Sequence, residues 1–265
     1  MGNVVNKGWK NLVPPLMLVF LILIVWELIV RIENIEKWLL PAPSDIAAAL
    51  MDNAVLLAHH TIPTLWETLA GLVIGTVAAL MLAAVIELSP WLRKALYPLL
   101  VGTQTVPIVA IAPLFIVWFG YGFLPKMLIV VLVTFFPIVV SVAEGFRSAD
   151  RDMVRLLLSM GAGRWRVFRS VRFPHAMPYL FSGLKIAATY SVMGAVVAEW
   201  LGAQSGLGVF LVRAQHSFAA DKVFAAIIVI TFWSIVLFLA VQAASRLFAP
   251  WIYVDEKSQG RRGSK

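Results

Sequence analysis

Seven arginines gathered in one stretch are the residues of this chain with the clearest chemistry. The stretch runs from Glu144 to Pro178 between two uncharged apolar runs, and its arginines are Arg147, Arg151, Arg155, Arg164, Arg166, Arg169 and Arg172. Lipid cannot solvate guanidinium groups, so this stretch must form a large loop on one side of a membrane. Its chemistry is the binding of acidic groups through charge-assisted hydrogen bonds.

Capping signals predict a first short helix within this loop. Ser148 or Asp150 can cap a helix that begins near Arg151, because both side chains accept hydrogen bonds from the first free backbone N–H groups. Gly161 suits the left-handed conformation that commonly ends a helix. The helix should therefore lie between Asp150 and Gly161.

A second short helix is expected at 163–171, ended by Phe173 and Pro174, with Pro178 starting the next apolar run. The arginines of this helix surround the helical wheel instead of forming one stripe. A helix lying on lipid would segregate its charges. The pattern fits better inside an acid-lined cleft of a partner protein.

The elements around the loop are expected to be membrane spans. Of the 265 residues, 61% are hydrophobic and only 14% are charged, and the mean hydropathy is +0.88. A soluble domain of this length cannot bury so much apolar surface, so the composition predicts an all-α integral membrane protein. The net charge of +8 comes from cations beside apolar runs, which favours the lipid bilayer over nucleic acid as a partner. The absence of cysteine excludes disulfides and thiolate metal sites.

Six stretches are apolar and long enough to cross a bilayer as helices. They are residues 12–30, 66–87, 97–119, 126–143, 178–198 and 223–246. The first is too long for the apolar part of a signal peptide and is expected to remain as an uncleaved span. With the N-terminus inside, 16 Lys and Arg fall in inside segments and five in outside segments. The positive-inside rule therefore predicts that both termini and the arginine loop are cytoplasmic.

We predict a single transmembrane domain over residues 1–265. Its core lies at about 60–250, its cytoplasmic loop at 144–178 and its polar C-terminal tail at 251–265. Rows of small residues at four-residue steps mark faces where helices approach closely, in the second span (Gly71, Gly75, Ala79, Ala83) and in the fifth (Gly183, Ala187, Ser191, Ala195). Ordinary bundle packing and a moving or subunit-lining interface both explain these rows.

Prolines interrupt two of the predicted spans. Pro107 and Pro113 lie in the third span, and Pro137 lies in the fourth. Broken helices survive in a membrane where neighbouring helices or a cavity satisfy the freed carbonyl groups. Simple kinks are the alternative explanation.

A spaced pattern through the loop resembles a known signature. The chain has Arg155-Leu156-Leu157, then three residues, Gly161, nine residues, Val171, one residue and Phe173-Pro174. The inner-membrane permeases of bacterial binding-protein-dependent ABC importers carry Glu-Ala-Ala, Gly, Ile and Leu-Pro at the same spacing. Because Arg-Leu-Leu replaces Glu-Ala-Ala here, an ion pair made by that glutamate in relatives is not carried over to this chain.

Two further patches resemble the nitrate, sulfonate and taurine subgroup of these permeases, which includes transporters of vitamins and vitamin precursors. They are Trp118-Phe119-Gly120-Tyr121-Gly122 and Ala198-Glu199-Trp200-Leu201-Gly202. The resemblance implies a type I ABC importer permease fold of about six transmembrane helices in the bacterial inner membrane. It also implies a permease pair, expected to be a homodimer, cytoplasmic ATP-binding subunits and an external solute-binding protein.

The resemblance places the contact with the ATPase in the second half of the loop. The residues implied are Arg155, Gly161, Ala162, Gly163, Arg164, Trp165, Arg166, Phe168 and Pro174. A rigid, charged and capped helix pair can transmit a displacement from such a partner, whereas a flexible tail cannot. This loop is therefore expected to couple ATP hydrolysis to transport.

Polar groups at membrane depth are the candidates for the translocation pathway or its gate. We name Thr103, Gln104, Thr105, Pro107, Met193 and Glu199. The three polar residues before Pro107 can bind substrate at a broken helix or bond between helices. Glu199 can brace an outer gate, meet the external binding protein, or be a solvated helix end. The third and fourth spans hold no cation at their centres. This favours a neutral or aromatic nitrogenous solute, such as a vitamin precursor, over a sulfonate, taurine or nitrate. Anionic solutes remain the alternative, because helix N-termini can bind anions without a charged side chain.

No residue pattern indicates catalysis or a cofactor bound by this chain. A phosphate-binding loop motif is missing, the histidines lack metal-ligand spacing, and no serine, histidine and acid constellation is evident. ATP and Mg²⁺ are therefore expected on a separate subunit. The alternative function is an ATP-independent secondary transporter or channel, which predicts acidic relays within the membrane; the spans offer few acids away from their ends.

Overall fold

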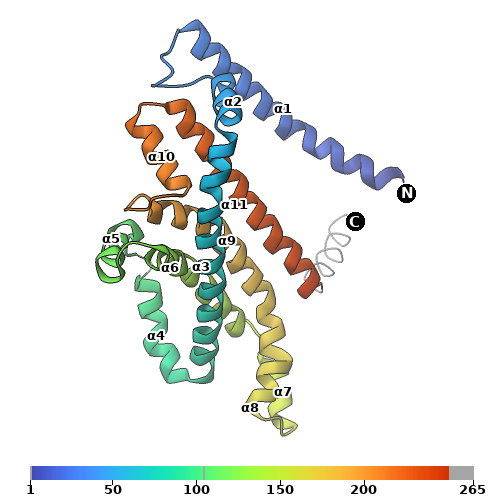
Figure 1. Ribbon diagram of the computed structural model, residues 1–265. Coiled ribbons are helices and arrows are strands. Elements are labelled where there is room, and N and C mark those ends of the chain that lie inside the picture. Colours follow the sequence, from blue (N-terminus) through green and yellow to red (C-terminus); the bar gives the residue numbers. More distant parts are fainter. Residues whose placement is uncertain (1, 104, 251–265) are drawn as a thin grey trace.

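The computed structural model describes residues 2–103 and 105–250, and in this part of the chain every regular element is a helix. The elements are α1 (Gly2–Ile32), α2 (Pro43–Asp52), α3 (Ala54–Leu88), α4 (Pro90–Thr103), α5 (Ile108–Phe119), α6 (Phe123–Arg147), α7 (Arg151–Ser159), α8 (Arg164–Val167), the π-helix η1 (Phe168–Arg172), α9 (Phe173–Glu199), α10 (Leu207–His216) and α11 (Ala220–Phe248). Figure 1 shows them as an elongated bundle.

Five helical stretches are long and apolar enough to cross a membrane: α1, α3, α6, the continuous helix from α8 to α9, and α11. A sixth span arises if α4 and α5 count together, and these two are bent by 98° at their junction. The prediction of about six spans is thus confirmed. The three prolines have different effects on their helices. Pro107 lies at the break before α5, whereas Pro113 and Pro137 lie inside helices that continue through them.

The second span is longer than predicted, because α3 begins at Ala54 and not at residue 66. The added turns contain His60 and Thr64, which lie before the predicted span, and both are buried, as is Glu67 just after them. Two short helices also escaped prediction. Both α2 and α10 have 10 residues, which is too short to cross a bilayer.

The core lies where α3, α6 and α9 meet, and its buried residues include Leu72, Ala79, Ala83, Ile138, Val139, Val142, Ala187 and Ala188. Both rows of small residues face α6. A Cβ atom on Gly71 would lie 2.5 Å from Val130, and one on Gly183 would lie 2.9 Å from Ser141. The close approach of α6 to both helices therefore requires glycine, and at these positions ordinary bundle packing explains the rows.

The two ends of the bundle differ in the short helices that they carry. Figure 1 shows α7 and α8 projecting at one end, with α2 and α10 near the other. The first helix, α1, runs away from the core and leaves most of its apolar side chains exposed. The arginine loop and the turn after Glu199 consequently lie at opposite ends of the long helix α9.

Candidate functional site

The first helix of the loop forms as its capping residues predict. Asp150 is the N-cap of α7, and its Oδ1 accepts hydrogen bonds from the N–H groups of Asp152 at 2.8 Å and Met153 at 3.4 Å. At the other end Gly161 has φ +82°, and the next residue, Ala162, donates its N–H to the Leu157 carbonyl at 2.9 Å. Only glycine adopts this conformation without cost, so the end of α7 is fixed locally.

The second helix of the loop does not end at Phe173 and Pro174, and this prediction was wrong. Instead α8, η1 and α9 form one continuous helix from Arg164 to Glu199. The reason is the π-helical turn: the Phe173 N–H donates to the Phe168 carbonyl five residues earlier. Pro174 lies directly after this turn, at the start of α9. Proline has no N–H to donate, but at this position no α-helical hydrogen bond of a preceding α-turn is lost.

The tip of the loop is exposed and cationic. Trp165 is 67% exposed and stacks on Phe168 with ring centroids 5.6 Å apart, and Phe168 in turn packs against Phe146 of α6. Arg164 and Arg166 flank the tryptophan and are exposed. The aromatic stack thus joins the tip to a membrane span, so the tip is held firmly while its charges stay available.

The remaining residues assigned to the ATPase contact lie around this tip. Gly163 is the N-cap of α8, and Ala162 is half-buried beside it. Arg155 projects from α7 into solvent, 3.6 Å from Asp152 and with both side chains largely exposed, so this ion pair contributes little. Pro174 lies further along, at the beginning of α9.

A buried carboxylate that the sequence reasoning missed anchors the loop. Glu87 at the end of α3 accepts hydrogen bonds from Arg172 of η1 and from Arg93 of α4. Its side chain is buried, whereas both arginines are about one-third exposed. Glu87 therefore ties the loop to a membrane span and to the turn between α3 and α4. The sequence places this acid at the edge of an uncharged span, but it does not show which residues are its partners.

A second buried carboxylate organises the opposite end of α9. Glu199 is 1% exposed and accepts hydrogen bonds from Thr64 Oγ1 and from the Gly208 N–H, both at 2.6 Å. Thr64 Oγ1 also accepts from the Leu207 N–H at 2.9 Å. A Cβ atom on Gly206, which has φ +126°, would overlap the Glu199 carboxyl. Glu199 is thus no solvated helix end; it fixes the turn between α9 and α10 against α3.

Further polar contacts extend this cluster. His60 Nδ1 accepts a hydrogen bond from the Gly206 N–H at 3.0 Å, so this histidine has a structural role in the turn. Glu67, also buried, forms an ion pair with Lys126 of α6. Neither contact was predicted, because each joins residues far apart in sequence.

A cavity of about 570 Å³ lies at the break between α4 and α5. Its lining consists of Thr103, Val106, Ile108, Ile111, Leu132, Val133, Phe136, Pro137 and Tyr190. None of these side chains is charged. Of the predicted pathway residues, Thr103 contributes to the lining and Pro107 is the N-cap of α5. The ring residues Phe136 and Tyr190 were not singled out in the sequence.

Two other predicted pathway residues, Thr105 and Met193, do not line this cavity. Thr103 and Thr105 donate their hydroxyl hydrogens to carbonyl groups of their own turn, Leu100 and Gly102, at 2.8 and 2.7 Å. Met193 is exposed and does not line the cavity. Gln104 lies outside the described residues. The structure thus joins only part of the predicted pathway set into one site.

Comparison with known proteins identifies this architecture. Residues 71–253 match the family described as "Binding-protein-dependent transport system inner membrane component". The formylaminopyrimidine transport permease protein ThiX of Halalkalibacterium halodurans is 34% identical over 93% of this chain and 98% of its own length. The riboflavin transport system permease protein RibX of Chloroflexus aurantiacus is 32% identical over 92% and 91%. The taurine transport system permease protein TauC of Escherichia coli is 31% identical over 87% and 86%.

A solved structure supports the same fold. The chain matches the crystal structure of an amino acid ABC transporter with histidines at a TM-score of 0.59, covering 77% of this chain and 97% of that one, with 17% sequence identity. This likeness bears on the fold alone. The family match over most of the chain and the similarity to the relatives above lead to one conclusion: this multi-pass membrane protein belongs to the inner-membrane permeases of binding-protein-dependent ABC importers.

Proposed function

We propose that this chain forms the translocation pathway for one small solute and is driven by a separate cytoplasmic ATPase through the loop at 144–178. The observation that carries the proposal is the exposed cationic tip around Trp165, held against α6 by its aromatic stack. A tip that is both charged and rigid suits an acid-lined cleft on a moving partner. ATP and Mg²⁺ bind the partner, and an external binding protein delivers the solute.

The continuous helix supports a mechanical connection. A displacement of the tip is passed along α8, η1 and α9 without a loop that would absorb it. The Glu87 contact with Arg172 passes the same displacement to α3. At the far end, Glu199 joins α9 to the turn before α10. Movement of the loop thereby reaches the opposite end of the bundle.

The proposed topology places both termini and the loop in the cytoplasm, with two copies of the chain side by side as a homodimer. The charge bias between inside and outside segments supports this orientation. Figure 1 supports the position of the loop in this proposal, since α7 and α8 lie at the end opposite α2 and α10. Residues 1–265 act as one transmembrane domain in this proposal.

The proposed solute is a small neutral nitrogenous compound of the vitamin-precursor kind. The uncharged lining of the cavity between α4 and α5 supports this choice, as do the names of the formylaminopyrimidine and riboflavin relatives. A taurine permease is nearly as similar, so a sulfonate, taurine or nitrate is the competing solute class. Measuring the binding of pyrimidines, taurine and nitrate to the cognate external protein decides between them. Tight binding of taurine alone would overturn the neutral-solute proposal.

The coupling proposal is tested by reversing the charge of the tip. Arg164→Glu/Arg166→Glu should abolish co-purification with the ATPase and ATP-driven uptake while leaving membrane insertion intact. The matched control is Arg213→Glu/Lys222→Glu, which reverses two exposed cations of α10 and α11. Normal co-purification of the tip variant would count against the placement of the contact.

Reconstitution separates this function from the alternative. The chain alone in vesicles should show no uptake, and uptake should begin only when the ATPase, ATP and the external binding protein are all present. Gradient-driven uptake by the chain alone, unchanged by ATP depletion, would favour a secondary transporter or channel.

A further inference from the structure

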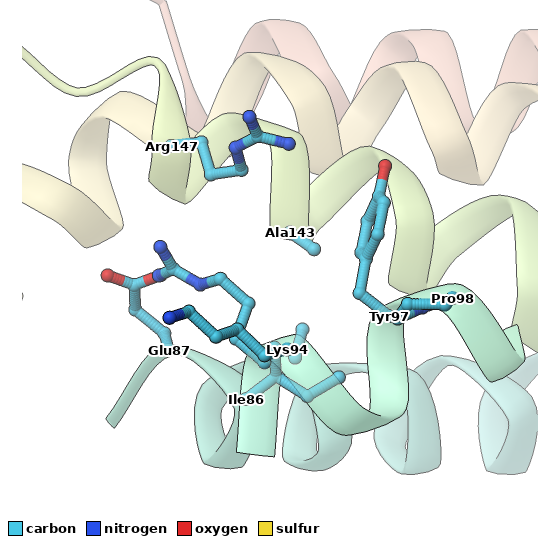
Figure 2. A pocket seen from close by; sticks show the side chains of 9 residues that line it. Ile86, Glu87, Lys94, Tyr97, Pro98, Ala143 and Arg147 are labelled. Carbon is cyan, nitrogen blue, oxygen red and sulfur yellow. The ribbon is translucent and has the colours of Figure 1, made fainter. Parts of the chain in front are cut away.

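A second cavity, separate from the one between α4 and α5, lies between α3, α4 and the end of α6. It has a volume of about 330 Å³ and is lined by Ala83, Ile86, Glu87, Arg93, Lys94, Tyr97, Pro98, Ala143 and Arg147. Figure 2 shows Glu87 and Lys94 on one side of the cavity, Arg147 on the wall across from them, and Tyr97 with Pro98 on the side away from Glu87. The cavity therefore has a cationic end and an apolar end.

The cationic end carries more positive than negative charge. Its one carboxylate, Glu87, already accepts hydrogen bonds from Arg93 and from Arg172. Within the described part of the chain, neither Lys94 nor Arg147 has a carboxylate partner. Two cations thus face the same cavity without a counter-charge.

The apolar end continues into the membrane-spanning part of the bundle. Ala83 and Ile86 belong to α3 and Ala143 belongs to α6, and both helices are candidate spans. The cavity is equivalent to about eleven water molecules at ~30 Å³ each, which is too small for a whole lipid but large enough for a headgroup and the first part of a chain. The remainder of such a molecule would extend into the bilayer.

We propose that this cavity binds the headgroup of an anionic phospholipid. The phosphate lies between Lys94 and Arg147, and the beginning of an acyl chain lies along Ile86, Pro98 and Ala143. Basic pockets between membrane helices bind anionic headgroups in this way, because the phosphate pairs with the cations while the chain stays in an apolar environment. Inorganic phosphate would satisfy the cations but gain nothing from the apolar end. An acidic segment of another protein would satisfy the cations but would leave the apolar end, which residues of two candidate spans form, without a matching partner, and this makes it the less suitable occupant.

The test is a titration of the full-length permease in a neutral detergent with dioleoyl phosphatidylglycerol or dioleoyl phosphatidylcholine, followed by thermal unfolding. The anionic lipid should raise the unfolding midpoint and the zwitterionic lipid should not. Lys94→Gln/Arg147→Gln should weaken the apparent affinity about 30-fold, since one cation near the membrane surface contributes about fivefold. The control Arg213→Gln/Lys222→Gln, which neutralises two exposed cations on α10 and α11, should bind as the parent does.

A second variant keeps both cations and fills the apolar end. Ala143→Leu should also lose the response to phosphatidylglycerol, and this result would separate a lipid from a free anion. Three outcomes would overturn the proposal: the same response to both lipids, an unchanged response in Lys94→Gln/Arg147→Gln, or full replacement of the lipid by inorganic phosphate. Loss of ATPase co-purification in that double variant, with lipid binding unchanged, would assign the face to a protein contact and would also overturn it.

Discussion

Replacing Glu87 by glutamine should uncouple ATP hydrolysis from transport, because Glu87 joins the loop to α3. Glutamine keeps the shape of the side chain but has one acceptor oxygen and no charge. One of the two arginines therefore loses its acceptor, and the other keeps a weaker bond. The substitution therefore weakens the connection without leaving a cavity in place of the side chain.

The magnitude follows from the two bonds. A hydrogen bond to a charged group contributes about 1.5–3 kcal/mol, whereas a neutral one contributes about 0.5–1.5 kcal/mol. One lost bond and one weakened bond would amount to about 3 kcal/mol. Arg172 and Arg93 are 33% and 36% exposed, so water recovers part of this loss, and we expect a net effect of about 2 kcal/mol. This corresponds to a ~30-fold drop in the equilibrium constant for the arrangement in which Glu87 holds both arginines.

The assay measures solute uptake and ATP hydrolysis together in vesicles containing the reconstituted importer. Glu87→Gln and Arg172→Met should lower the uptake obtained per ATP hydrolysed. Arg93→Met should lower the thermal midpoint with a smaller effect on this ratio, because Arg93 belongs to α4 and not to the loop. The control Glu144→Gln changes an exposed glutamate on α6. A wild-type ratio in Glu87→Gln would refute the reasoning.

Three further predictions concern other parts of the molecule. The hydrogen bond and the charge of Lys37 lower the pKa of Asp45. This pair therefore stabilises the fold above the ordinary aspartate pKa, and the stabilisation is lost as the pH falls through the lowered pKa. The difference in thermal midpoint between the parent and Lys37→Met should be present at pH 7 and shrink below about pH 4. Thr64→Val removes the hydroxyl between Glu199 and the following turn, which should cost about 1–3 kcal/mol for each buried group left unpaired and should speed proteolysis of that turn. Gly161→Val should destabilise the end of α7 by about 1–2 kcal/mol, because φ there is +82°, whereas Gly161→Asn should behave more like the parent; limited proteolysis of the loop measures both.

Local features of this fold could be predicted from the sequence because neighbouring residues determine them. Asp150 and Gly161 begin and end α7 through bonds to residues two to five positions away. The existence of the spans follows from hydropathy, and the break before α5 follows from Pro107. Each of these depends on a short stretch of chain.

The anchors of the site could not be predicted, because they join residues far apart in sequence. Glu87 and Arg172 are 85 positions apart, and Thr64 and Glu199 are 135 apart. The sequence does not show which helices are neighbours, so an acid at the end of a span is interpreted from the sequence as exposed to solvent. The continuity of the helix through Pro174 was missed for a different reason: a proline ordinarily ends a helix, and no periodicity in five residues reveals a π-helical turn.

That π-helical turn sets the angular register between the cytoplasmic tip and the fifth span. A π-turn amounts to one residue more than an α-helical ladder needs, and each residue rotates an α-helix by about 100°. Deleting one residue together with the π-turn would keep the tip nearly in place, whereas an ordinary α-helix that retained all the residues between Phe168 and Arg172 would turn the tryptophan and its flanking cations to another side of the helix axis. Every contact would remain chemically available, yet the tip would point the wrong way. In this molecule the π-helical hydrogen bonding of a five-residue segment decides the direction in which the loop is presented.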